Sequence, residues 1–207
     1  MGCSQVDMQM PEKIKDASNQ ARAALSGACS DEDSALMLQA AEGDEHALRM
    51  IIEKWKNPLA NYFYRSTANR HSAEDLCQQT FINLYKARNS YTPKAKFSTY
   101  LFFIARRVLI NEHRKNLRRP SDATDPAEID SPVNGRTDLE ISELEEIFYK
   151  TLESMPENQR TAILLLKQQE LSYDEIADIM NAKVAAVKTW LHRARQTLRE
   201  ALELAKS

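Results

Sequence analysis

Basic and hydrogen-bonding side chains recur at helical spacing near the end of the 207-residue chain. At about 100° per residue they fall on one arc of a helix. The arc holds Ala185, Thr189, His192, Arg193 and Gln196, with Lys188, Arg195 and Arg199 toward its sides. Small residues beside such donors suit a helix in the major groove of DNA, where Arg reads guanine and Thr contacts a base or a phosphate. The arc therefore predicts contact with duplex DNA; a helical hairpin with a solvated basic face is the alternative.

A second group of cations lies in residues 86–119, interleaved with aromatic residues. This stretch holds ten Lys and Arg residues and a single acid, Glu112. Cations beside rings on which bases can stack are typical of proteins that bind single-stranded nucleic acid. A buried helix stripe accounts for Phe97, Leu101, Ile104 and Val108. Because Tyr91, Tyr100 and Phe103 lie off that stripe, we expect their rings to be available to a single strand.

A predicted helix-turn-helix, residues 172–202, positions the arc. Ser172 followed three residues later by Glu175 is a capping box, which marks a helix start. Asn181 follows the apolar pattern of that helix, and Asn tolerates the left-handed backbone that ends many helices. The second helix has an apolar stripe opposite the arc, formed by Val184, Val187, Leu191, Ala194, Leu198 and Leu202.

Helical stripes also run through residues 34–86. Gly43 and Asp44 interrupt the first stripe, so we expect two antiparallel helices, the second continuing past Pro58. Ser72 with Asp75 predicts a further capped helix. The outer face of that helix holds Asp75, Gln78, Gln79, Ile82 and Lys86. An isoleucine ringed by amides and a carboxylate is a candidate docking surface for another helix.

Residues 120–136 divide the chain into two modules. They contain prolines, a glycine and four acids without an apolar period, which is typical of an extended linker. We therefore expect residues 34–119 and 137–207 to form two small helical domains. The polar residues 1–33 predict a disordered extension.

The second module begins with another capping-box pattern, Thr137 with Glu140, and Pro156 suits the first position of its next helix. With four glycines and seven prolines, the chain has little material for turn-rich β structure. We expect an all-α fold of two domains on a flexible acidic linker. The C-terminal domain should be a helix-turn-helix, winged-helix-like, DNA-binding domain.

Composition excludes several other classes. Cys3, Cys29 and Cys77 form no CxxC pair and lie near no histidine at ligand spacing, so we expect neither a disulfide framework nor a metal site. Cys77 should be a small buried residue. Common catalytic and nucleotide-binding motifs do not occur, so we expect a non-enzyme without a cofactor. No apolar run predicts membrane insertion or a signal peptide, and we expect a cytoplasmic protein.

Two segments resemble bacterial RNA polymerase sigma factors. The second conserved region of that family resembles SAEDLCQQTFINLYKARNSYTPKAKFSTYLFFIARRVLINEHRK, which begins at Ser72. The fourth resembles MPENQRTAILLLKQQELSYDEIADIMNAKVAAVKTWLHRARQTLREAL, which begins at Met155. No substantial domain lies between them, which indicates the small extracytoplasmic-function (ECF) group. Residues 34–119 would then be sigma region 2 and residues 137–207 sigma region 4.

This resemblance implies a role for each surface. The surface that grips the β′ clamp of core polymerase would be formed by Asp75, Gln78, Gln79 and Ile82. Residues 91–98 match the loop that captures a flipped base of the minus-ten element. Contact with that element would involve Tyr91, Lys94, Lys96, Tyr100, Arg106, Arg107, Asn111 and Arg114. The minus-thirty-five element would be read by Lys188, Thr189, His192, Arg193 and Arg195.

The resemblance also implies the partners. They are core RNA polymerase, through its β′ clamp and β flap, promoter DNA, and in some family members an anti-sigma factor. The expected function is to direct polymerase to specific promoters and help open the DNA. A stand-alone helix-turn-helix regulator that does not bind polymerase is the first alternative, and a helical adaptor that binds no DNA is the second.

Overall fold

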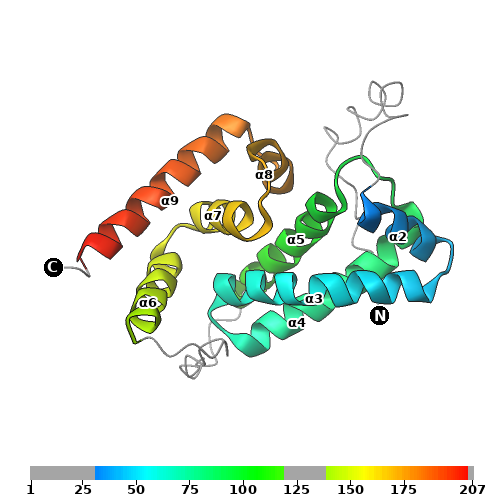
Figure 1. The fold of residues 1–207 in the computed structure, drawn as a ribbon, viewed down its shortest axis with the longest axis horizontal. Coiled ribbons are helices and arrows are strands. Elements are labelled where there is room, and N and C mark those ends of the chain that lie inside the picture. The colour runs from blue at the N-terminus through cyan, green and yellow to red at the C-terminus, as the bar shows by residue number, and fades with distance from the viewer. Residues whose placement is uncertain (1–30, 119–138, 205–207) are drawn as a thin grey trace.

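The computed structural model describes residues 31–118 and 139–204 (Figure 1). Throughout these residues the secondary structure is helical and contains no strand, which confirms the all-α prediction. The elements in order are α2 (Glu32–Ala41), α3 (Glu45–Thr67), α4 (Arg70–Ala87), the 3₁₀ turn η1 (Arg88–Ser90), α5 (Phe97–Arg118), α6 (Leu139–Ser154), α7 (Glu157–Gln169), α8 (Tyr173–Met180) and α9 (Val184–Leu204). None of the described helices is long and apolar enough to cross a bilayer.

The first module packs α2, α4 and α5 around the long helix α3. Gly43, at φ +105°, makes the predicted turn, and the Asp44 carboxylate caps α3 by accepting from the amides of His46 and Ala47. Helix α3 continues through Pro58 as expected. The fully buried side chains of this module include Met37, Ile51, Leu59, Tyr62, Phe63, Phe97 and Phe102. Cys77 is a buried thiol, and burial raises its pKa to about 11.

One predicted helix start and the predicted first residue of this module differ from the structure. Helix α4 is capped by Asn69, whose side chain accepts from the Ser72 amide at 2.8 Å, so Ser72 lies inside the helix rather than at its cap. Asn is itself a strong N-cap residue, which explains the earlier start. At the other end, the module begins before Ser34, because Asp31 caps α2 and Asp33 is buried.

The second module places α8 and α9 on α6 and α7. The capping box of α8 is confirmed: the Ser172 hydroxyl accepts from the Glu175 amide at 3.2 Å, and the Ser172 amide donates to Glu175 Oε2 at 2.7 Å. Asn181 has the expected left-handed backbone at φ 48° and ψ 53°. Pro156 is the cap of α7 and not its first residue. Thr137 and the predicted linker lie outside the described residues.

The two modules pack directly against each other. Helix α8 lies on α5, and α6 and α7 lie on α3, as Figure 1 shows. Tyr62 of α3 is fully buried, and this burial raises the pKa of its hydroxyl. The positive charges of Arg106 on α5 and Arg160 on α7 lower the same pKa, but by less. We call this packing the closed arrangement.

Candidate nucleic-acid interface

The predicted reading arc lies on the outer face of α9. Its side chains, Ala185, Lys188, Thr189, His192, Arg193, Arg195, Gln196 and Arg199, are all exposed. The opposite face is fixed by the buried side chains of Val187, Leu191 and Ala194. Burial of one stripe therefore determines which donors α9 presents, as the periodicity predicts.

Three side chains of the arc make hydrogen bonds within the module, and one of these bonds runs from Gln196 Nε2 to Glu200 Oε1 at 2.9 Å. The Thr189 hydroxyl donates to the carbonyl of Ala185 at 3.0 Å, which holds its methyl group and oxygen in a fixed orientation. Arg195 Nη2 lies 3.4 Å from the Tyr173 hydroxyl, so this arginine leans toward α8. Lys188 and Arg193 are exposed in the N-terminal half of α9, and the N-terminal part of a recognition helix is the part that meets the bases.

Helix α4 presents the predicted docking surface to solvent. Asp75, Gln78 and Gln79 are exposed, and Ile82 keeps 46% of its surface accessible. Gln79 Nε2 donates to Asn83 Oδ1 at 3.0 Å, and Asp75 lies 3.8 Å from the His71 imidazole. These contacts stay within one helix, so the face as a whole remains available to a partner.

The side chains predicted to contact the minus-ten element differ in how far they are buried. Lys94, Lys96, Asn111 and Arg114 are exposed. Arg106, Arg107 and Tyr100 are half-buried. The Arg107 guanidinium lies 5.8 Å from the centre of the Phe103 ring, whereas Arg106 Nε is buried without a hydrogen-bond partner among the described residues. Part of the predicted minus-ten surface is therefore only partly accessible to solvent.

The position of Tyr91 differs from the prediction. Its ring is buried and is not available to a single strand of nucleic acid. It is 6% exposed and packs against Phe97 and Tyr100, with ring centroids 6.3 and 5.0 Å away. Its hydroxyl donates to Ser34 Oγ at 3.0 Å. This partner comes from α2, far away in the sequence, and a local periodicity cannot reveal such a contact.

An ion pair joins the helix-turn-helix to residues 91–96, the loop between η1 and α5, which we call the basic loop. Lys96 Nζ lies 3.0 Å from Glu175 Oε1, the same carboxylate that completes the capping box. Burial by itself raises the pKa of Glu175, but the hydrogen bonds from Ser172 and the Lys96 ammonium together lower it. Glu175 thus stabilises both α8 and the closed arrangement, a role that its local pattern does not show.

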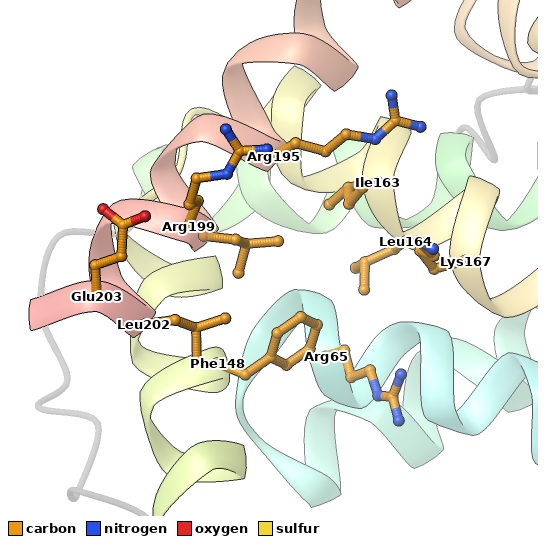
Figure 2. A pocket seen from close by; sticks show the side chains of 10 residues that line it. Arg65, Phe148, Ile163, Leu164, Lys167, Arg195, Arg199, Leu202 and Glu203 are labelled. Atoms are coloured by element: carbon orange, nitrogen blue, oxygen red, sulfur yellow. The ribbon is translucent and has the colours of Figure 1, made fainter. Parts of the chain in front are cut away.

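A groove of about 590 Å³ opens on another side of the second module, next to Arg65 of α3 (Figure 2). Its walls are formed by Phe148, Leu164, Leu198 and Leu202, with cations at its edges from Arg65, Lys167, Arg195 and Arg199. Apart from Arg65 of α3, the lining comes from α6, α7 and α9, three helices that are separate in the sequence. Sequence patterns could not predict it.

Together, a basic helix-turn-helix and a separate helical module with an exposed docking face define a DNA-binding transcription factor. Residues 51–119 match Sigma-70 region 2, and residues 145–198 match Sigma-70 region 4. The chain is 34% identical to the ECF RNA polymerase sigma factor SigW of Bacillus subtilis over 178 residues, covering 79% of this chain and 93% of the relative. This chain belongs to the ECF RNA polymerase sigma factor family.

Solved structures show the same fold. CnrH, in complex with the cytosolic domain of CnrY, is 23% identical with a TM-score of 0.64, over 84% of this chain and 99% of that one. The sigma factor RpoE of Bartonella quintana, in complex with the anti-sigma factor NepR, is 25% identical with a TM-score of 0.61, over 75% of this chain and 96% of that one.

Proposed function

We propose that this chain serves as a promoter-specificity subunit through three separate surfaces. The outer face of α4 binds the β′ clamp of core polymerase, through Asp75, Gln78, Gln79 and Ile82. The basic loop and α5 bind the minus-ten element, through Lys94, Lys96, Tyr100, Arg106, Arg107, Asn111 and Arg114. Tyr91 does not contact DNA in this proposal; its buried ring stabilises the loop. The outer face of α9 reads the minus-thirty-five element, through Lys188, Thr189, His192, Arg193 and Arg195.

The observation that supports this division best is the exposure of both α4 and α9. A stand-alone regulator needs only the reading helix, and would leave the α4 face with its accessible Ile82 unexplained. A helical adaptor would leave the basic arc unexplained. In this proposal the polymerase supplies the chemistry in the cytoplasm, and the subunit itself is not an enzyme.

Strand opening follows from base capture. A base that leaves the stack loses a few kcal/mol of stacking and pairing energy, which contacts in a protein pocket offset. The exposed Lys94 and Lys96 place positive charge beside the strand that carries the base.

The closed arrangement must open on a promoter. Elements at minus ten and minus thirty-five lie about 25 base pairs apart, which is roughly 85 Å along the duplex at 3.4 Å per base pair. Helix α8 lies between α5 and α9, and packed helices are about 8–10 Å apart, so α5 and α9 are separated by only about 20 Å. The modules must therefore move apart before they can bind both elements.

Polymerase and anti-sigma factors are the partners that fit this motion. The polymerase would separate the modules by binding α4 through its clamp and the second module through its flap. The B. quintana relative is described in complex with an anti-sigma factor, and we propose that this chain has such a partner too.

The test is run-off transcription with purified core polymerase on genomic fragments. We expect the full-length protein to direct initiation at specific sites, with a smaller requirement for it on a template that is already melted. Failure to initiate at any site, with active core enzyme, would reject the proposed function. Binding to a specific duplex without any effect on polymerase would instead support the stand-alone regulator.

A further inference from the structure

The first turn of α2 holds both ends of the basic loop. At the end of the loop, the Phe97 amide donates to Asp31 Oδ2 at 3.0 Å. At its start, the Tyr91 hydroxyl donates to Ser34 Oγ at 3.0 Å in a buried position. Both ends of the loop are thus bonded to the same helical turn. These bonds restrict the position of the exposed middle of the loop, which contains Lys94 and Lys96.

Helix α2 is in turn fixed to α3 by Asp33. Its carboxylate accepts from Lys54 Nζ at 2.6 Å and from Trp55 Nε1 at 3.2 Å, and only 8% of its side chain is exposed. The hydrogen bond to Asp33 raises the pKa of Lys54. The Trp55 ring lies 6.1 Å from the Phe97 ring. Phe97 is therefore linked to α2 twice, directly by the bond of its amide to Asp31 and indirectly through Trp55, which bonds to Asp33.

We propose that Asp31 and Ser34 are positioning residues for capture of the minus-ten base. A pocket that traps an extruded base gains most when its shape exists before binding, because the ordering cost has already been met in folding. The region 2 match begins at residue 51, so α2 lies outside the part of the chain that the family match covers. This inference rests on the proposed function of the loop.

The two oxygens of Asp31 separate positioning from helix capping. Oδ1 accepts from the Ser34 amide at 2.8 Å and caps α2, whereas Oδ2 bonds to Phe97. Asp31→Ser keeps one oxygen for the cap, since Ser and Asp are comparable caps, but leaves none for Phe97. Asp44→Ser is the matched control, because the Asp44 carboxylate bonds only to amides of its own helix.

The first measurement is hydrogen exchange of the full-length protein. In Asp31→Ser we expect faster exchange of the Phe97 amide, with the amides of α4 unchanged. In Asp44→Ser, exchange at Phe97 should match the wild type. Equal exchange at Phe97 in wild type and Asp31→Ser would show that the bond does not hold the loop, and would overturn the proposal whatever the protein does to DNA.

The second measurement uses holoenzyme and the single non-template strand of a promoter found by run-off transcription. The readout is the ratio of affinities for the cognate strand and for strands with one minus-ten base replaced. We expect Asp31→Ser to lower this ratio about threefold to tenfold, the size of one lost hydrogen bond. A loss of folded protein would lower both affinities together and leave the ratio unchanged.

Tyr91→Phe and Ser34→Ala provide a second route. Because they remove the same bond from either side, we expect each to lower the ratio and the double variant to lower it no further. If wild type discriminates but Asp31→Ser and Tyr91→Phe both match Asp44→Ser, the positioning role is wrong and the proposed function stands. If wild-type holoenzyme does not initiate at all, both proposals fall.

Discussion

Lys96 Nζ and Glu175 Oε1 lie 3.0 Å apart and join the basic loop of the first module to the capping box of the second. The Glu175 side chain is 16% exposed and that of Lys96 54%. The carboxylate therefore has two functions, one in α8 and one between modules. Its second oxygen accepts from the Ser172 amide, and a glutamine can make that bond as well.

We expect Glu175→Gln to weaken the closed arrangement without unfolding α8. The loss should be at most about 1 kcal/mol, because one partner of the pair is well exposed. Energy transfer between labels on α4 and α9 would report it as a shift toward longer distances. Lys96→Gln should add nothing further in the double variant. Lys150→Gln is the control, since the partner of Lys150 is Glu146 on the same helix; an equal shift there would exclude a specific pair.

The same pair predicts a pH dependence. The pKa of folded Glu175 lies below its ordinary value of about 4.5, so its ionised form is favoured by folding. Its contribution to stability is therefore present above that ordinary pKa and is lost as the pH falls through the folded pKa. The difference in melting temperature between wild type and Glu175→Gln should shrink on acidification. A difference that stayed constant to the lowest pH would show that the charge of Glu175 contributes nothing.

Sequence patterns predicted the features that depend on neighbours along the chain. The Ser172 capping box, the turn at Asn181 and the exposed faces of α4 and α9 all depend on residues within a few positions of each other. Helical periodicity determines such faces, because burial of one stripe exposes the opposite one. The start of α4 was missed because Asn69, just upstream, is the cap.

Contacts between distant residues could not be predicted in this way. Tyr91 is buried because Ser34, Phe97 and Tyr100 surround it, and Asp31 acts on a loop that begins sixty residues later. The closed arrangement depends on packing of α8 against α5, two elements from different modules. Local patterns give the faces of helices, whereas the partners of those faces require the three-dimensional structure.

Replacement of Asp75 and Gln78 tests the docking surface of α4. Both side chains are exposed and support no core contact, so Asp75→Ala with Gln78→Ala should leave the melting temperature nearly unchanged. We expect this double variant to lose association with core polymerase in co-purification. Glu74→Ala is a control on the same helix, because Glu74 is exposed but does not belong to the docking surface and pairs with Arg70 of α4. Unchanged co-purification of the double variant would remove α4 from the polymerase interface.

Replacement of Arg193 tests base reading by α9. Arg193 is exposed on the reading arc, and its loss should leave the fold intact because the buried stripe of α9 is untouched. We expect Arg193→Ala to weaken binding of holoenzyme to a matched promoter by about 1–3 kcal/mol, the value of a bidentate contact to guanine. Arg199→Ala removes a cation at the side of the arc, beside the groove, and should cost less. The decisive comparison is a promoter with a scrambled upstream element: a base-reading arginine matters little there, whereas a phosphate contact is lost equally from both. Equal losses for Arg193→Ala on matched and scrambled promoters would assign this arginine to the DNA backbone.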